Sequence, residues 1–429
     1  MDKARMLLVG VAAAVVMAVV AVVVLGGGDD DSPTAAAGSE GAATTVPSGD
    51  ATTTSADATT TTADEDAGTT GSSGGDGPSA DPAGSIADLL RWVPADVDGP
   101  IVVTDLARAR DAAGITPPVD DDDASRYLIE VAGGPVDPDG RVLPAAPSVG
   151  LDASPFDLDA WRQAFGFAPP DVLAAVEAGS PPGMITVYRV PVPGDVIVEA
   201  AVTDPDWFDR VTPATHAGIA FLDWGRDGEV DLSRAGGPRP LGRGGQLAAV
   251  DGVAIRTVMR DSMERALEAG ATGRSIVDQP EVAQVVAALD GIGVHGLVLV
   301  AGAVFPVVDL VADDAVPVAE SLLADGLVLV RPTWLGAGTA LVDGVRLDVV
   351  VLQHADPASA AENAERFTAI VERGTSLTSG EPWRDRLTLR SVTVDGTLVV
   401  AELEVEPTRR GVWLEALYTR DSLYWIDPG

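Results

Sequence analysis

Three histidines are the only imidazole groups in the chain, and they are the first residues to test for metal or acid–base chemistry. Hydrolytic zinc sites use two or three histidines held close in space. His216 precedes a predicted strand and His295 lies at a predicted helix–strand turn, so the pattern does not bring them together. His354 and Asp356 form one close pair, where a strand ends and a helix begins. A carboxylate there more often caps the helix than orients a catalytic imidazole, so we predict structural histidines.

Two glycine-rich segments could hold phosphate groups. Gly291–Gly296 reads G-I-G-V-H-G and matches the dinucleotide-binding pattern GxGxxG. That chemistry needs a strand before the glycines and a helix after them, so that the helix N-terminus receives the pyrophosphate. Here a helix comes first, with Gly291 at its C-terminal end, and a strand follows. The loop Gly242–Gly245, flanked by Arg239, has neither a following helix nor a lysine. We therefore expect no cofactor at either segment.

Acidic residues are abundant enough to raise metal binding and paired-carboxylate hydrolysis as possibilities. Asp120–Asp123 lack the alternating ligands, the glycine and the distal glutamate of a calcium loop, and Asp137–Gly140 is equally short of ligands. Both are predicted to be solvated loops. A glycosidase needs two carboxylates about 5–10 Å apart in a sugar-binding cleft, and counting acids does not exclude one. The sequence assigns no catalytic, cofactor-binding or metal-ligating residue, and a hydrolase using paired carboxylates stays an alternative.

The charge balance limits the partners. The chain has 28 basic and 65 acidic residues, a formal net charge of -37, and Lys3 as its only lysine. This excess of acid repels the phosphates of nucleic acids and of anionic membrane surfaces, so we predict no nucleic-acid partner. Lysine scarcity fits a GC-rich genome, while the acidity leaves adaptation to high salt open. The absence of cysteine excludes disulfides and thiol catalysis.

Met6–Leu25 is a run of twenty residues with no charged side chain. As a helix it would span roughly 30 Å, the thickness of the hydrocarbon core of a bilayer. Lys3 and Arg5 precede it and Asp29–Asp31 follow it, which predicts a cytoplasmic N-terminus and an extracytoplasmic C-terminal region. A cleaved signal peptide is the alternative, but its apolar run is usually about 7–15 residues. The nearest small-residue cleavage site, Ala35–Ala37, lies ten residues beyond the run. We expect an uncleaved single-pass anchor in the cell membrane.

Gly26–Ser85 differs in composition from everything that follows. It consists mainly of Gly, Ala, Thr, Ser and Asp, with eleven acidic residues and neither basic nor aromatic ones. Such a segment cannot bury enough apolar surface to offset the entropy lost on ordering, so a disordered stalk is predicted. As a flexible coil its ends would lie on the order of 40 Å apart.

Beyond the stalk, the same order of predicted elements occurs twice. A strand is followed by a helix, by two strands joined at a Val-Asp-Gly turn, and by a second helix. Asp-Gly between hydrophobic runs is a strong hairpin signal. The first copy also contains a predicted strand at Ala217–Trp224. The predicted segments are Met184–Val190, Asp195–Val202, Gln246–Met259 and Asp261–Ala269 in the first copy, and Val345–His354, Asp356–Arg373, Leu387–Val405 and Arg409–Tyr418 in the second.

These patterns predict an α+β fold of tandem βαββα units of the split βαβ, ferredoxin-like type, behind one transmembrane helix. The folded region is expected to begin near Ile86, with two short helices over Phe156–Ala178. The predicted domains are residues 1–25 (anchor), 26–85 (stalk), 86–295 (first unit with an N-terminal extension) and 296–429 (second unit).

Three stretches carry a resemblance to a known group. RWVPADVDGPIVVTDLARARDAAG (91–114), WRQAFGF (161–167) and GSPPGMITVYR (179–189) share the spacing of their aromatic, glycine and proline residues with that group. In this spacing the chain resembles a group of uncharacterised membrane- or lipid-anchored extracytoplasmic proteins of high-GC Gram-positive (actinobacterial) bacteria. The resemblance covers roughly residues 86–270. It implies an extracytoplasmic location and supplies no catalytic residue.

These observations favour a membrane-anchored, non-catalytic binding or scaffold module at the cell envelope, with an envelope protein or polymer as partner. Two alternatives stay open. One is the envelope hydrolase with paired carboxylates. The other is a solute-capturing receptor, which would place a deep apolar pocket between Met184–Gly270 and Val345–Gly429.

Overall fold

The computed structural model describes residues 85–118, 120–133, 144, 157–302, 316–406 and 411–427. The predicted anchor and the predicted stalk up to residue 84 lie outside these residues. Within them, no helix is both long and apolar enough to cross a bilayer.

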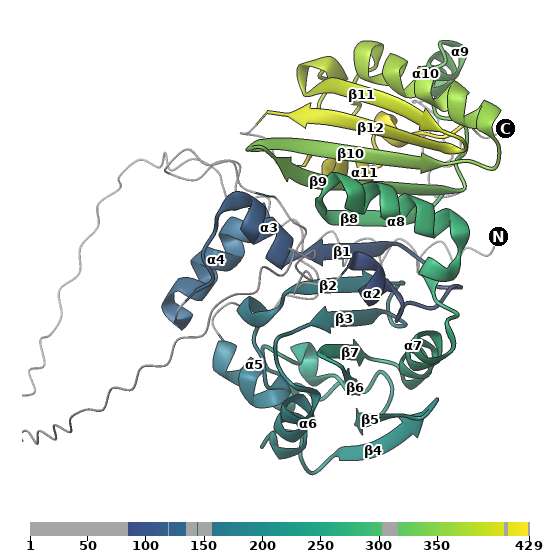
Figure 1. Ribbon diagram of the computed structural model, residues 1–429. Coiled ribbons are helices and arrows are strands. Elements are labelled where there is room, and N and C mark those ends of the chain that lie inside the picture. Colours follow the sequence, from purple (N-terminus) through teal and green to yellow (C-terminus); the bar gives the residue numbers. More distant parts are fainter. Residues whose placement is uncertain are drawn as a thin grey trace, which may run out of the picture. The chain divides into compact units, whose positions relative to one another are not determined.

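Twelve strands form one sheet in which every neighbouring pair is antiparallel (Figure 1). The strand order is β11-β12-β10-β9-β8-β1-β2-β3-β7-β6-β5-β4. The strands are β1 Ile101–Asp105, β2 Ala174–Ala178, β3 Ile185–Arg189, β4 Val211–His216, β5 Ile219–Trp224, β6 Gly245–Val250, β7 Val253–Thr257, β8 Val294–Ala301, β9 Trp334–Val342, β10 Val345–Gln353, β11 Leu387–Asp395 and β12 Leu398–Val405.

Helices flank the sheet, and their ends follow from local capping chemistry. The side chain of Asp356 accepts hydrogen bonds from the backbone N–H groups of Ala358 and Ser359, which fixes the start of α10. The helices are α2 Ile86–Leu90, α3 Leu106–Ala113, α4 Asp121–Gly133, α5 Leu158–Phe165, α6 Gly194–Thr203, α7 Arg260–Thr272, α8 Pro280–Ile292, α9 Val316–Ala324, α10 Pro357–Arg373 and α11 Val412–Tyr418.

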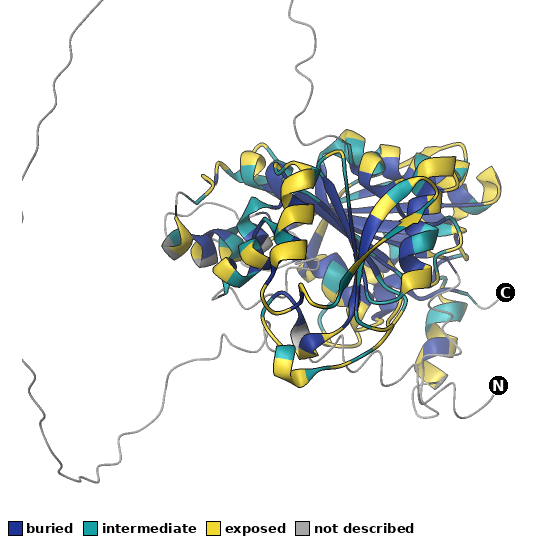
Figure 2. Ribbon diagram, turned by 90° about the horizontal axis from the view of Figure 1, so that it is seen from below, coloured by how far each residue is buried: buried dark blue, intermediate teal, exposed yellow. Residues whose placement is uncertain are grey.

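The core lies in a layer on each side of the sheet. On one side, apolar side chains of the strands pack against α2, α7 and α8. On the other side, one cluster joins the strands to α3, α5 and α6, and a second joins them to α10 and α11. The half-buried Val102 of β1 packs against both of these clusters, so they share a face of the sheet. Figure 2 shows the buried strands between helices whose outer surfaces are exposed.

The predicted tandem of ferredoxin-like units is wrong. The central strand β1 pairs with β2 on one side and with β8 on the other, which joins all twelve strands into a single sheet. The predicted division after residue 295 falls inside β8. Hairpins are specified by neighbouring residues, whereas the pairing of Ile101 with Leu299 depends on segments far apart in the chain. Local pattern therefore predicted strands and hairpins but not how they assemble.

Both predicted hairpins form, but their turns differ. Asp251 and Gly252 are the central residues between β6 and β7, with φ values of 49° and 76°, as a type I′ turn requires. In the second hairpin Asp395 already pairs with Leu398, so the turn begins at Gly396, with φ 59°. The two glycines are therefore not at equivalent positions. Of the hairpins that were not predicted, the one between β9 and β10 has another Val-Asp-Gly turn.

Two shorter predictions are also wrong. The second helix expected within Phe156–Ala178 is a short 3-10 turn followed by strand β2, because the two prolines at 169 and 170 only start a turn and Ala174–Ala178 pairs between β1 and β3. Asp120–Asp123 is not a loop but the start of α4, where the Asp120 side chain accepts a hydrogen bond from the backbone N–H of Asp123. Asp137–Gly140 lies outside the described residues.

Candidate functional site

The three histidines belong to separate parts of the sheet, in β4, in β8 and just after β10. His216 ends β4, with its Nδ1 4.0 Å from a carboxylate oxygen of Glu264. His295 is fully buried in β8, 2.7 Å through its Nε2 from the carbonyl oxygen of Pro144, and burial lowers its pKa to about 4. His354 is buried against Asn363. No group of three histidine or acidic side chains in the described residues could hold a metal ion.

The glycine motif Gly291–Gly296 has the helix-then-strand order that its sequence context predicted. Gly291 is still inside α8, and Gly293 ends that helix with φ 84°, two residues later than expected. The segment then continues directly into β8. A strand therefore stands directly after the glycines, where phosphate binding would need a helix N-terminus.

Arg239, the cation beside the Gly242–Gly245 loop, is buried and engaged. Its guanidinium donates to the carboxylate of Asp204, and both side chains are 3% exposed. The guanidinium carbon lies 5.1–5.3 Å from the ring centres of Phe165, Trp207 and Trp224. We call these five residues the arginine cage. Burial lowers the pKa of Arg239 to about 10, which leaves it charged at neutral pH. Its charge is used inside the protein and does not face a ligand.

Two neighbouring carboxylates meet near the start of α7, an arrangement that sequence reasoning missed. The Gln246 amide nitrogen lies 3.4 Å from Asp223 Oδ1 and 3.2 Å from Asp227 Oδ1. Arg260 binds both acids, through a side-chain contact of 3.3 Å to Asp223 and its backbone N–H to Asp227. Arg260 also pairs with Glu264 at 2.9 Å. Every acid of this group faces a donor, so the group ties β5, β6 and α7 together.

Asp348 is a fully buried carboxyl group in β10. One oxygen accepts a hydrogen bond of 2.9 Å from the backbone N–H of Trp413. The residue that precedes α11 is Gly411, which has no side chain to cap the helix, so Asp348 supplies the acceptor from the sheet. The Trp413 indole donates to Thr339 on the neighbouring strand. Burial raises the pKa of Asp348 to about 7, against the opposing effects of the Trp413 hydrogen bond and of Arg346.

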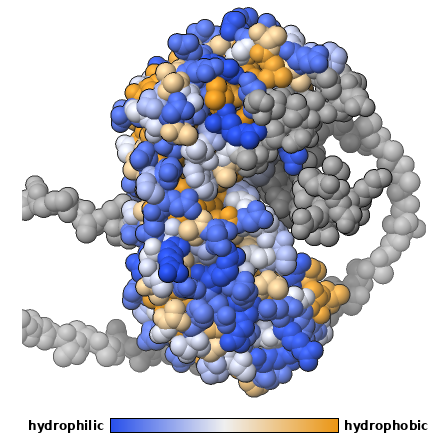
Figure 3. All heavy atoms as spheres, turned by 90° about the vertical axis from the view of Figure 1, so that its right-hand side faces the viewer, coloured by the Kyte–Doolittle hydropathy of each residue, from blue (hydrophilic) through white to orange (hydrophobic). Residues whose placement is uncertain are grey.

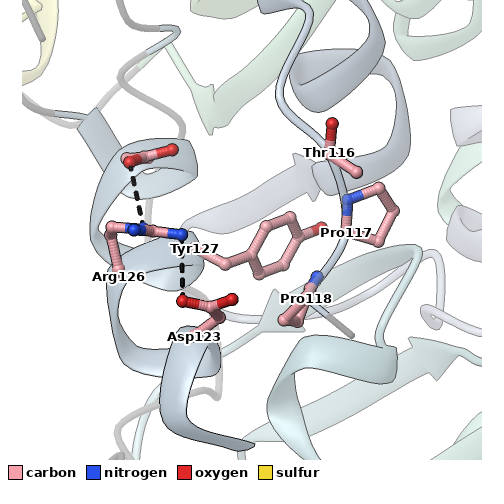
Figure 4. Close-up of a pocket in the computed structure, with 7 residues that line it drawn as sticks. Thr116, Pro117, Pro118, Asp123, Arg126 and Tyr127 are labelled. Atoms are coloured by element: carbon pink, nitrogen blue, oxygen red, sulfur yellow. Dashed lines mark ion pairs between the residues drawn. The ribbon is translucent and has the colours of Figure 1, made fainter. Parts of the chain in front are cut away.

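Two surface hollows in the described residues are small. One, of about 120 Å³, lies between α4 and residues 116–118 (Figure 4). Its Arg126 pairs with Asp123 at 2.9 Å and with Glu130 at 3.7 Å, and Tyr127 forms its buried wall. A second, of about 290 Å³, lies beside α7 and is lined in part by the ion pair of Arg265 with Asp96. Ligand pockets typically enclose about 300–1,000 Å³.

Most of the large exposed apolar side chains in the described residues lie on α6, on the turn after it, or in the loop 230–241. Hydrophilic residues cover most of the coloured surface in Figure 3, with smaller hydrophobic patches between them. Of the twelve large hydrophobic residues that are exposed in the described chain, seven fall in two segments, 196–208 and 230–241. We call six of them the α6–loop surface: Val198, Val202, Phe208, Val230, Leu232 and Leu241. Val196 lies on the opposite flank of α6, about 160° around the helix axis from Val198.

Ion pairs join the two segments of this surface. The Arg234 guanidinium forms a bidentate pair with the Asp209 carboxylate, with hydrogen bonds of 2.7 and 3.0 Å, and Arg210 donates a hydrogen bond of 3.0 Å to Glu229. Trp207 of the arginine cage lies beneath, with the Arg234 guanidinium carbon 5.7 Å from its ring centre. The exposed apolar side chains are thus presented on a braced scaffold.

Comparisons with known proteins add little. No protein-family model matches the chain, and no curated protein is similar to it in sequence. Among solved structures, crystal form III of TP0453 is 9% identical, with a TM-score of 0.33, and covers 77% of this chain and 98% of its own. Crystal form I of TP0453 is 8% identical, with a TM-score of 0.30, covering 78% and 97%. A likeness this distant carries no argument about fold or function.

Proposed function

We propose that the protein is a non-catalytic binding or scaffold protein of the cell envelope. Met6–Leu25 anchors it in the membrane with the N-terminus in the cytoplasm, and Gly26–Ser85 holds the folded region away from the membrane. The length of the apolar run and the change from positive to negative charge across it support this placement.

The α6–loop surface is the observation that carries the binding role. Exposed apolar clusters on soluble domains mark interaction sites more often than scattered apolar residues do. This cluster is also braced, because the arginine cage and two ion pairs order the loop beneath it before any partner arrives. Order present before binding reduces the entropy lost on association.

The two alternatives receive less support. Two neighbouring carboxylates, Asp223 and Asp227, are tied to Gln246 and Arg260. A solute receptor would need a cleft between Met184–Gly270 and Val345–Gly429. In the sheet, β9, β8, β1 and β2 lie between β10 and β3 as paired strands, so continuous sheet occupies that place.

Site-specific photo-crosslinking on intact cells tests this function. The full chain would carry a photoreactive phenylalanine at position 208, which is 60% exposed, or at position 394, which is 45% exposed on edge strand β11. We expect a discrete adduct from position 208 that is absent from position 394. The absence of any adduct at position 208, or the same adducts from both positions, would contradict the proposal.

A further inference from the structure

The α6–loop surface is acidic as well as apolar. Asp195 and Glu199 are exposed on α6 beside the exposed Val198 and Val202, and neither forms an ion pair within the part of the chain that the structure describes. They stand four residues apart, so they face each other across one helical turn. Two like charges at this spacing destabilise a helix. A cation placed between them would remove that cost.

Across the same surface, the arginines near Trp207 have partners inside the protein. Arg210 pairs with Glu229, Arg234 with Asp209, and Arg239 with Asp204. These cations brace the loop, and their charges are balanced by the acids they bind. The two α6 carboxylates are not balanced in this way, so an incoming group meets apolar side chains beside unpaired negative charge.

We infer that the α6–loop surface receives a protein segment with an apolar face flanked by lysine or arginine side chains. This inference rests on the binding role proposed above and specifies the chemistry of the partner. The apolar face covers Val198, Val202 and Phe208, and the flanking cations lie against Asp195 and Glu199. Charge complementarity of this kind accelerates association and excludes partners of the wrong sign.

The same charges argue against two other occupants. A second copy of the chain would bring an identical acidic surface, from a molecule with a net charge of -37, against this one. An anionic lipid surface would be repelled for the same reason. A basic segment of another protein is the occupant that both the apolar and the charged residues fit.

The experiment uses the full chain in nanodiscs of zwitterionic lipid and a fluorescein-labelled, 18-residue helical peptide of leucine and lysine in an amphipathic pattern. Fluorescence anisotropy measures binding, with a leucine–glutamate peptide of the same pattern as the charge control. The double variant Phe208→Ser, Leu232→Ser should weaken binding of the lysine peptide about tenfold or more. The matched variant Leu377→Ser, Val394→Ser removes two apolar side chains of 44% and 45% exposure elsewhere and should change affinity less than about twofold.

The acidic residues are tested in the same way. Asp195→Asn with Glu199→Gln should weaken binding and reduce its salt dependence. Asp325→Asn with Glu365→Gln removes two exposed acids, elsewhere on the surface, that form no ion pair within the described residues, and it serves as the charge-matched control. Circular dichroism checks that each variant is folded.

Several results would overturn the inference. Equal losses from the two acid pairs would mean that the peptide senses only the total charge. Equal binding of the glutamate peptide would remove the requirement for cations. Sedimentation could reveal a dimer, or the protein could bind anionic vesicles. If Phe208→Ser abolishes either of these interactions, the surface belongs to that other occupant. If position 208 crosslinks to a partner on cells while the lysine peptide does not bind, the binding role stands and only the partner chemistry is wrong.

Discussion

His295 and Asp348 should give the folding stability opposite pH dependences that cancel in the native sequence. Both side chains are fully buried. Burial lowers the pKa of His295 from 6.5 to about 4 and raises that of Asp348 from 3.8 to about 7. Between about pH 4 and 6.5, the unfolded chain carries a protonated histidine and an ionised aspartate, while the native protein carries neither charge. The pair therefore binds one proton in either state.

The direction in which each residue changes folding stability with pH depends on whether the native or the unfolded state binds its proton. For His295 the unfolded state binds it between about pH 4 and 6.5, so its contribution to stability is complete above pH 6.5 and is lost as pH falls. For Asp348 the native state binds it between about pH 4 and 7, so its contribution is complete at low pH and is lost as pH rises. At about 1.4 kcal/mol per pH unit, the full changes are about 3 kcal/mol for His295 and about 4 kcal/mol for Asp348.

Replacing either residue should reveal the pH dependence of stability that the other one causes. Asp348→Asn keeps a side-chain oxygen that can accept the hydrogen bond from the Trp413 N–H, and it removes the titratable carboxyl group. Its free energy of unfolding, relative to the native sequence, should rise by about 1.4 kcal/mol per pH unit from pH 4 to 7. His295→Gln should show the opposite trend, a relative decrease of about 1.4 kcal/mol per pH unit from pH 4 to 6.5.

Urea unfolding of the full chain, followed by tryptophan fluorescence at half-unit steps from pH 4 to 8, measures these differences. The eight tryptophans all lie in the described residues, so the signal reports on the folded region. Glu365→Gln, an exposed acid on α10, is the control and should give a flat difference. Flat differences for both Asp348→Asn and His295→Gln would refute the argument, because both groups would then titrate alike in the native and unfolded states.

Four further outcomes are expected. External protease should remove the folded region from intact cells, and a protected region would contradict the orientation assigned from Met6–Leu25. Shortening Gly26–Ser85 by half should shift the melting temperature by less than about 2 °C, because this segment offers almost no apolar side chains to dock; a larger drop would mean that it packs. Gly252→Val and Gly396→Val should each lower the unfolding free energy by about 1–3 kcal/mol in urea titrations, since both glycines have positive φ; unchanged midpoints would contradict this. Asp204→Asn should lower the unfolding free energy by about 3–5 kcal/mol, because the buried Arg239 loses its charged partner. A loss below about 1 kcal/mol would show that the aromatic rings alone stabilise the Arg239 charge.

Local chemistry made several elements predictable from the sequence. Asp356 and Pro357 mark the start of α10, and the capping hydrogen bonds are present. Asp251-Gly252 predicts its hairpin because a type I′ turn needs positive φ at both positions. Each of these signals acts within a few residues, so no knowledge of the rest of the fold is required.

Two missed strands show where that reasoning ends. Gly336 and Gly338 weaken the strand pattern of β9, yet the sheet uses them because α8 packs closely against Gly336 and strand β8 lies close to Gly338. A Cβ at position 336 would lie 2.6 Å from a methyl carbon of Val285. β4 contains Pro213, and none of its residues is fully buried. Both features suit a strand at the edge of a sheet, where the missing N–H of a proline does not leave a carbonyl of a further strand unpaired. Their strand character depends on neighbours supplied by distant parts of the chain.

The candidate sites were less predictable for the same reason. Asp348 sits among valines and leucines in β10, and only the arrival of Trp413 from the C-terminal region explains a carboxyl group there. The α6–loop surface joins segments separated by more than twenty residues through ion pairs. A helical pattern for α6 is visible in the sequence, but the exposure of its valines is visible only in the assembled fold.

The scarcity of cations connects the stability of the fold to the character of its surface. Basic residues number 28 against 65 acidic ones, so most acids have no cation of their own to pair with. The fold uses arginines where a planar, charged group contributes most to stability, which is against aromatic rings and beside carboxylates. Arg239 and Arg234 both stack on Trp207 in this way. Acids that remain unpaired, such as Asp195 and Glu199, therefore collect on the outer surface. A partner that supplies cations there would balance charge that the chain itself cannot, which is why charge as well as shape should decide what binds to the α6–loop surface.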